Sequence, residues 1–386
     1  MGSSDAVRPG RSPRRSAARP ARSGRRGAPV VAVTGASGPV GERVVAALAG
    51  VPDDVRRVVG VDAQRGRATG VAWRVADASS PAVADKLAGA DVVVHLACDT
   101  DLAAALVTDA GLRRGRAVRS AQAVLTASAA VGARHVVVVT SAMVYGALAD
   151  SPIPLAEDAP LQAPPDAGLV GDLLEVERLV DIAGRSYPAL TLTSLRPAAL
   201  VGAGIDTVVT RHFEAPRLLT VREAPTVWQF CHVDDLASAV VRVVLDGLAG
   251  PLTVGSEGVL TQTSLEQLSG MRRVELPSAL AFGTAERLHR VGVLPMPVGD
   301  LAYVVHPWVV PSTRLRDAGW RPAFDNETCL GVLLEQVRGR RALAGRRVDG
   351  KDAALGAAGA VVALVGTAAV WRQARVRQAR RRSGRG

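Results

Sequence analysis

Three glycines at regular spacing are the first residues in this chain whose type and pattern could do chemistry. They stand in the run TGASGPVG, which follows the apolar run VVAV and opens an amphipathic stretch. Glycine permits a tight turn, lets backbone amides approach a pyrophosphate and lets a helix pack on the preceding strand. Because a helix N-terminus favours anions, the pattern predicts a dinucleotide site. Its residues are Gly35, Ala36, Ser37, Gly38, Pro39, Val40 and Gly41.

An acidic residue follows at the spacing that such a site requires. Asp62 ends the next Val-rich run, VRRVVGVDA, after the amphipathic stretch. A carboxylate there can bind the adenosine ribose hydroxyls and repel a 2′-phosphate, so NAD is the predicted cofactor. Arg65 and Arg67 lie close by, and they leave NADP as the alternative.

The elements that must position these residues alternate along the chain. Short Val-rich runs are separated by helical patterns, including a long helical stretch from about 116 to 131. This alternation is typical of an α/β fold with a doubly wound parallel sheet. The predicted organisation is a basic tail (1–28), a Rossmann domain that binds NAD(P) (29–200), a smaller substrate lobe (201–345), an apolar helix (353–371) and a basic tail (372–386).

Charge and cysteine content exclude several function classes. The net charge is +11, but residues 29–371 hold 32 basic and 35 acidic residues, so the basicity lies in the two tails. Aromatic residues make up 3% of the chain and none lies among the arginine runs, which argues against sequence-specific nucleic-acid recognition. Cys98, Cys231 and Cys329 are widely spaced, so we expect no metal site and a reducing, cytoplasmic location.

Several motifs in order resemble one known family. They are TGASGPVG, VADAS around Asp77, DVVVHLA (91–97), VVVVTSAMVYG (136–146), SLRPAALVG (194–202), FCHVDDLA (230–237), VGSEG (254–258) and RLRDAGWRP (314–322). Together they resemble the extended short-chain dehydrogenase/reductase family, of the NAD-dependent epimerase/dehydratase type, over roughly 29–340. The resemblance implies pyrophosphate contacts for Gly35, Gly38 and Gly41, and a ribose contact for Asp62.

The same resemblance implies roles for residues further along the chain. Asp77 would lie at the adenine and Ala97 at the nicotinamide half, while Arg196 and Pro197 would form a loop beside the nicotinamide. Ser141, in SAMVYG, matches the catalytic serine or threonine of the family.

The family's tyrosine and lysine are missing from this sequence. The family uses a tyrosine whose phenolate is stabilised by a lysine four residues later, because an unperturbed phenol is a poor base at neutral pH. When Glu177 is aligned with the glutamate usual on that helix, Leu169 takes the tyrosine position and Leu173 the lysine position. Lys86 and Lys351 are the only lysines in the chain, and neither is near this motif.

Two hypotheses follow from this pattern. The first is a protein that binds NAD(H) and a small-molecule ligand for sensing or as a scaffold, without the usual redox chemistry. The second is a sugar-nucleotide or related epimerase, dehydratase or reductase that uses Ser141 with a relocated acid or base. The candidate groups for that acid or base are Asp166, Asp172, Glu175, His212 and His232.

The segment 353–371, AALGAAGAVVALVGTAAVW, is uncharged and just long enough to span a membrane as a helix. The arginine-rich tail that follows would then lie on the outer side, against the positive-inside tendency. A membrane span, an interfacial helix and a docked interaction helix therefore all stay open. The resemblance also suggests a homodimer.

Overall fold

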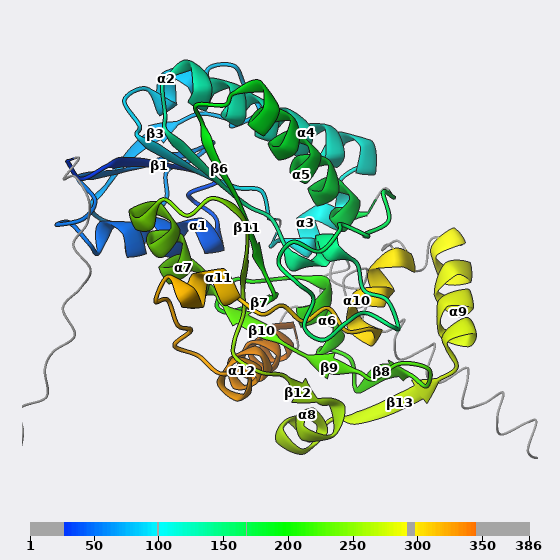
Figure 1. Ribbon diagram of the computed structural model, residues 1–386. Coiled ribbons are helices and arrows are strands. Elements are labelled where there is room, and N and C mark those ends of the chain that lie inside the picture. The colour runs from blue at the N-terminus through cyan, green and yellow to red at the C-terminus, as the bar shows by residue number, and fades with distance from the viewer. Residues whose placement is uncertain (1–26, 99, 167, 292–297, 345–386) are drawn as a thin grey trace, which may run out of the picture.

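The computed structural model of the protein describes residues 27–98, 100–166, 168–291 and 298–344. Their largest element is a sheet of seven parallel strands in the order β3-β2-β1-β4-β5-β6-β11 (Figure 1). The strands are β1 (Val30–Thr34), β2 (Arg57–Asp62), β3 (Val71–Val75), β4 (Val92–Leu96), β5 (His135–Val139), β6 (Thr191–Pro197) and β11 (Gly250–Val254). The predicted doubly wound α/β sheet is confirmed.

Strand β1 shows why the Val-rich runs form the centre of this sheet. All five of its residues are buried. Val31 and Val33 belong to the hydrophobic core on one face of the sheet, and Val30 and Ala32 to the core on the other face. Since successive side chains of a strand point to opposite faces, a strand covered on both sides must be apolar at every position.

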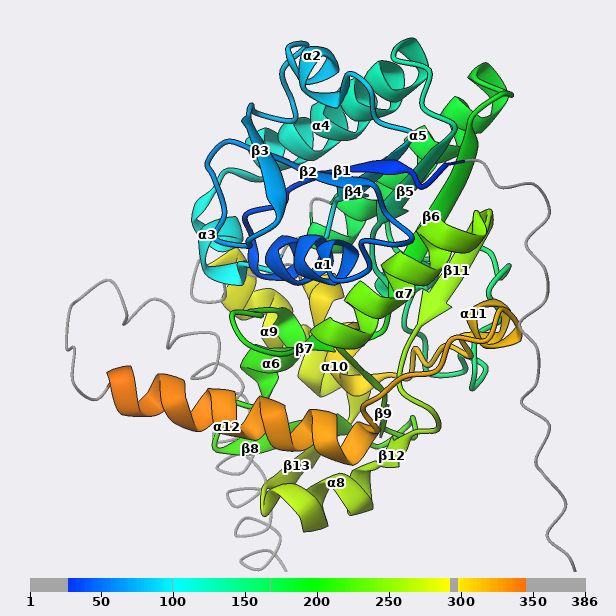
Figure 2. The ribbon, with the colours of Figure 1, turned by 90° about the vertical axis from the view of Figure 1, so that its left-hand side faces the viewer.

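Helices cover both faces of the sheet. α1 (Pro39–Ala49) and α7 (Val233–Asp246) pack together on one face, while α2 (Val83–Leu87), α4 (Ala110–Ala130) and α5 (Leu169–Ser186) lie on the other (Figure 2). The long helix expected from about 116 is α4, and it begins earlier, at Ala110. There the side chain of Asp109 accepts a hydrogen bond from the backbone N–H of Leu112 at 3.0 Å, which caps the helix.

A smaller lobe lies beside the carboxyl ends of the strands (Figure 1). Its strand pairs are β7 (Ala199–Val201) with β10 (Phe230–His232), β8 (Arg217–Val221) with β13 (Arg272–Leu276), and β9 (Val227–Trp228) with β12 (Leu260–Thr261). The remaining helices are α3 (Leu102–Val107), α6 (Val208–His212), α8 (Gln262–Ser269), α9 (Ser278–Arg290), α10 (Ala302–Val305), α11 (Thr313–Asp317), α12 (Asn326–Ala344) and the short 3-10 helices η1 (Ala142–Tyr145) and η2 (Val298–Leu301).

Part of the range 201–345, assigned by sequence to the substrate lobe, lies with the sheet. β11 pairs with β6 at the sheet edge, and α7 buries Leu236 and Val240 in the core that it shares with α1. The chain therefore returns to the sheet before it completes the smaller lobe. The amphipathic pattern of α7 requires a large apolar surface to cover, and the sheet face provides it.

None of the helices within the described ranges is long and apolar enough to cross a membrane. The segment 353–371 and the basic tail 372–386 lie outside the described residues, as does most of the tail 1–28.

Candidate functional site

The glycine turn joins β1 to α1 as the sequence predicts. Gly35 has a φ of 76°, a left-handed conformation that other residues rarely adopt. A Cβ on Gly41 would lie 2.2 Å from the carbonyl oxygen of Gly35, so only glycine allows this contact between helix and turn. On Gly38, the nearest atom to an added Cβ is 3.8 Å away. The turn is therefore closed on its inner side and open at Gly38, at the N-terminus of α1, which fits a pyrophosphate bound by backbone amides.

Asp62 lies beside this turn at the end of β2. One of its carboxylate oxygens accepts hydrogen bonds from the backbone N–H and the hydroxyl of Ser37, both at 2.9 Å. The side chains of Arg65 and Arg67 are exposed. The carboxylate is thus fixed next to the glycine turn, where the ribose of NAD would lie.

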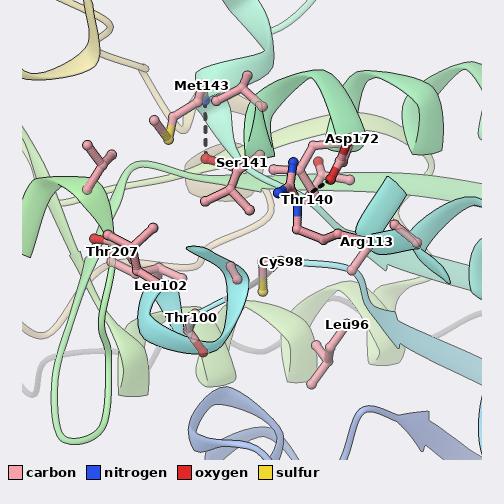
Figure 3. Close-up of a pocket in the computed structure, with 18 of the residues that line it drawn as sticks. Leu96, Cys98, Thr100, Leu102, Arg113, Thr140, Ser141, Met143, Asp172 and Thr207 are labelled. Atoms are coloured by element: carbon pink, nitrogen blue, oxygen red, sulfur yellow. Dashed lines mark hydrogen bonds and ion pairs between the residues drawn. The ribbon is translucent and has the colours of Figure 1, made fainter. Parts of the chain in front are cut away.

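A cavity of about 760 Å³ lies between β4, β5, α3, α4, α5 and the smaller lobe (Figure 3). Asp77 and Ala97 both line it, as the resemblance implies. The backbone N–H and the hydroxyl of Ser79 donate to Asp77 at 2.8 Å each, and they lower the pKa of its carboxyl group. The resemblance places the adenine at Asp77 and the nicotinamide half at Ala97.

Ser141 lines the cavity at the carboxyl end of β5. Of the motif VVVVTSAMVYG, only the Val-rich part belongs to β5, which ends at Val139, and Ser141 caps the 3-10 helix η1. Its Oγ accepts a hydrogen bond from the backbone N–H of Met143 at 3.2 Å (Figure 3). The hydroxyl proton therefore stays available for a bound ligand.

Leu169 and Leu173, on α5, also line the cavity. Both side chains are half-buried, and they stand one helical turn apart on the face of α5 that looks toward Ser141. Lys86 belongs to α2, and Lys351 lies outside the described residues. In this cavity, aliphatic side chains therefore occupy the two positions that the alignment assigns to the tyrosine and the lysine.

A buried ion pair lies directly behind the cavity wall at Thr140. Glu177 binds Arg196 through two contacts, from Nε at 2.9 Å and from Nη2 at 2.7 Å. Thr140 donates to the same carboxylate at 2.6 Å and Ser194 at 2.8 Å. Arg196 also donates to the hydroxyl of Tyr145 at 2.9 Å. In the sequence Glu177 served only to align the helix, because its partners lie far away in the chain, on β6 and directly after β5.

This ion pair engages the guanidinium of Arg196, a residue that the resemblance places beside the nicotinamide. Neither Arg196 nor Pro197 is among the described residues that line the cavity, whereas the next two residues, Ala198 and Ala199, do line it.

Asp172 lines the cavity but is held by two arginines of α4. Nε of Arg113 lies 2.7 Å from one carboxylate oxygen (Figure 3). Nε of Arg114 lies 2.9 Å from the other. The guanidinium of Arg114 also donates to the backbone carbonyl of Asp166. The two guanidinium groups engage both carboxylate oxygens, so this geometry suits a structural tie between α4 and α5.

The other carboxylates proposed as acids or bases make local contacts. Asp166 accepts from the backbone N–H of Gly168 at 2.8 Å. Glu175 pairs with Arg178 at 2.6 Å on the outer side of α5. Neither of these two acids is among the described residues that line the cavity.

The two proposed histidines lie in packed surroundings. His212 is buried and stacks on Trp228 with ring centroids 5.6 Å apart, and burial lowers its pKa to about 4. His232 stacks on Phe324 at 3.8 Å and accepts from the backbone N–H of Asp234 at 3.3 Å. Neither histidine is among the described residues of the cavity wall.

Asp300, in η2, is a cavity residue that the sequence analysis missed. It is only 4% exposed, and burial, together with the negative charge of Asp166, raises its pKa to about 7. A Cβ on the neighbouring Gly299 would lie 2.7 Å from Oδ2 of Asp166, so the two acids come close together. The sequence could have indicated a buried acid here, because Asp300 is the single charged residue within the apolar run VGVLPMPVGDLAYVV.

The raised pKa of Asp300 makes stability depend on pH. Because the folded state holds this proton more tightly than the unfolded chain, the stabilisation is complete below the ordinary pKa of 3.8 and is lost as pH rises through about 7. Urea unfolding at about pH 5 and about pH 8 should therefore show a smaller pH-dependent loss for Asp300→Asn than for the wild-type protein. Equal losses would show that Asp300 titrates normally.

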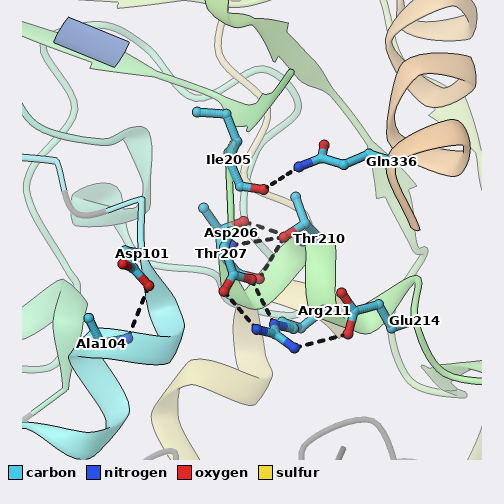
Figure 4. A network of polar contacts seen from close by, with 9 residues as sticks. All are labelled: Asp101, Ala104, Ile205, Asp206, Thr207, Thr210, Arg211, Glu214 and Gln336. Carbon is cyan, nitrogen blue, oxygen red and sulfur yellow. Dashed lines mark hydrogen bonds and ion pairs between the residues drawn. The ribbon is translucent and has the colours of Figure 1, made fainter. Parts of the chain in front are cut away.

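Asp206 and Thr207 bring the smaller lobe to the cavity wall (Figure 4). Arg211 binds both carboxylate oxygens of Asp206, at 2.7 and 2.8 Å. The backbone N–H of Leu102 donates to the carbonyl of Asp206 at 3.0 Å, and Gln336 of α12 donates to the carbonyl of Ile205 at 2.8 Å. The start of α3 and the segment before α6 are thus joined by a direct hydrogen bond at the cavity wall.

Proteins of known sequence resemble this chain over most of its length. It is 28% identical to uncharacterized proteins of Mycobacterium bovis and Mycobacterium tuberculosis over 322 residues, which cover 80% of this chain and 83% of those proteins.

Solved structures share its fold at low sequence identity. MoeE5 in complex with UDP-glucuronic acid and NAD is 22% identical, with a TM-score of 0.57 over 80% of this chain and 99% of that chain. The dTDP-glucose 4,6-dehydratase DesIV from Streptomyces venezuelae with NAD bound is 20% identical, with a TM-score of 0.60 over 81% of this chain and 98% of that chain.

A family profile matches the chain itself, whereas the solved structures show only a shared fold. The profile of the NAD dependent epimerase/dehydratase family matches residues 31–253, a range that contains the glycine turn, Asp62, Ser141 and α5. The chain therefore belongs to the NAD-dependent epimerase/dehydratase family.

Proposed function

We propose that the protein binds NAD together with a small-molecule ligand, in a sensing or scaffold role, without the tyrosine- and lysine-dependent hydride transfer of its family. The observation that carries this proposal is the position of Leu169 and Leu173 on the wall of the cavity that Ser141 also lines. Aliphatic side chains can neither donate nor accept a proton. NAD would supply hydride chemistry when bound, but these two positions provide no group that could move the proton.

Support for cofactor binding comes from the glycine turn and Asp62. Gly41 allows the close contact that forms the turn, and Gly38 leaves its outer side open. The N–H groups at the start of α1 would hold the pyrophosphate, and the carboxylate of Asp62 would accept from the ribose hydroxyls.

Calorimetry and a turnover assay test the proposal together. NAD and NADH should bind the purified protein, while UDP-glucose and dTDP-glucose should be recovered unchanged after incubation with the NAD-loaded protein, as chromatography of the sugar nucleotides would show. If neither NAD(H) nor NADP(H) bound at millimolar concentration, the proposed function would be wrong.

Substitution of Asp62 tests the predicted cofactor preference. Asp62→Asn should weaken NAD binding by about tenfold, because the neutral amide accepts ribose hydroxyl bonds less strongly than the carboxylate does. It should also narrow the preference for NAD over NADP, since the charge that repels a 2′-phosphate is gone. Titration with both cofactors measures the ratio, and an unchanged ratio would show that Asp62 does not set it.

The alternative function is an epimerase, dehydratase or reductase with a relocated acid or base. The observation that favours it is Asp300, a buried carboxyl on the wall of the cavity that Ser141 also lines. If turnover is found, Ser141→Ala and Asp300→Asn should each reduce kcat while NAD binding stays intact. A turnover that neither substitution affects would rule out this pair of residues.

Two further proposals concern the setting of the protein. We place it in the cytoplasm, supported by the wide spacing of Cys98, Cys231 and Cys329 along the chain, which argues against a disulfide framework. We also propose a homodimer, which sedimentation equilibrium of the full chain would test.

A further inference from the structure

The wall that the smaller lobe contributes to the cavity is apolar. Leu102, Ala199, Val208 and Val209 line the cavity and belong to one hydrophobic cluster. The half-buried side chains of Met143, Leu169 and Trp308 pack against this cluster and also line the cavity. Figure 3 shows Leu102 and Met143 around one end of the cavity and the ion pair of Arg113 with Asp172 at the other. Apolar surface that stays accessible inside a cavity gains most from an apolar ligand.

The arginines that line the cavity belong to α4: Arg113 pairs with Asp172, and Arg116 and Arg119 lie near Asp77. On the wall from the smaller lobe, the charge argues against a nucleotide diphosphate. Among the described residues between 198 and 308 that line the cavity, the charged ones are Asp206 and Asp300, and none is lysine or arginine. Diphosphates are normally bound by arginine, lysine or helix N-termini. Here the guanidinium of Arg211 is engaged by Asp206 and Glu214.

The N-terminus of α6 is also satisfied by its own side chains. Thr207 Oγ1 accepts from the backbone N–H of Thr210 at 3.3 Å, and Thr210 Oγ1 accepts from that of Thr207 at 2.8 Å. These bonds form a capping box, which uses the donors that would otherwise face an anion.

One polar group at this end can orient a neutral ligand. The Oγ of Ser141 already accepts from Met143, so its proton is the part that a ligand can use. It can donate to a carbonyl or hydroxyl oxygen. A directed donor among mostly apolar side chains is the usual arrangement of a small-molecule pocket.

We infer that the end of the cavity lined by the smaller lobe takes an uncharged small molecule with an apolar body and one carbonyl or hydroxyl oxygen bound by Ser141, and not a sugar nucleotide. This rests on the proposed function, since it names the ligand class for the same cavity.

The neutral fluorophore N-phenylnaphthylamine is the probe for the apolar wall. It should bind the full chain saturated with NAD, at one site per chain, and UDP-glucose should neither displace it nor bind by calorimetry. Leu169→Asn should weaken probe binding by about tenfold, because a polar group replaces apolar contact. The matched control is Ile182→Asn, on the exposed side of the same helix, which should leave binding unchanged.

Each result decides the inference. Tighter binding of UDP-glucose than of the probe would overturn it, and so would equal effects of the two substitutions. If Leu169→Asn does not fold, Leu173→Gln on the same wall replaces it. Absence of NAD binding would refute the proposed function alone, since the probe can be titrated in the same way without NAD.

Discussion

Glu177→Ala is expected to lower the free energy of unfolding by about 3–5 kcal/mol, because it leaves the guanidinium of Arg196 buried without its carboxylate. Arg196 makes two contacts with Glu177, and the side chains of both residues are less than one-tenth exposed. The substitution also removes the acceptor of the Thr140 and Ser194 hydroxyls. Urea unfolding at neutral pH measures the change.

Two controls separate the buried pair from a general effect of losing an acid. Glu175→Ala removes a carboxylate from the same helix that pairs with Arg178 at the surface, and it should change stability by about 0–1 kcal/mol. The double variant Glu177→Leu with Arg196→Met should be more stable than Glu177→Ala, because no unpaired charge stays buried. A loss for Glu177→Ala as small as that for Glu175→Ala would contradict the role given to the buried pair.

Gly41→Ala is expected to abolish NAD binding and to destabilise the fold by about 1–3 kcal/mol, typical of forced overpacking. The added Cβ would lie 2.2 Å from the carbonyl oxygen of Gly35 and 2.6 Å from Cα of Ala36. Backbone atoms cannot move aside as the end of a flexible side chain can, so α1 must shift relative to the turn. Calorimetry with NAD and thermal unfolding record the two effects.

Gly38→Ala is the matched comparison within the same turn. The nearest atom to its added Cβ is 3.8 Å away, and its backbone has an ordinary extended conformation. The fold should therefore be unaffected, while the methyl group occupies the side of the turn that is open to the pyrophosphate. NAD affinity should fall at least about tenfold. Unchanged NAD binding in Gly38→Ala would show that the pyrophosphate does not approach at this glycine.

The sheet and the cofactor turn could be predicted from sequence because both depend on neighbours in the chain. A strand buried on both faces must be apolar throughout, and a helix that follows a tight turn requires glycine at set positions. The same local logic identified Asp62, while the resemblance to the family pointed to Ser141 and aligned Leu169 and Leu173 with the tyrosine and lysine positions.

The polar environment of the cavity was decided only by the tertiary structure. Asp172 was a candidate base in the sequence, yet its carboxylate is bound by Arg113, which lies 59 residues away in the chain. Asp300 was overlooked, because its burial and the nearby charge of Asp166 arise only when η2 packs against the cavity. Charge and proton affinity depend on distance through space. The local amino-acid sequence therefore determines which elements form, and the packing of those elements determines which acids are paired, buried or able to hold a proton.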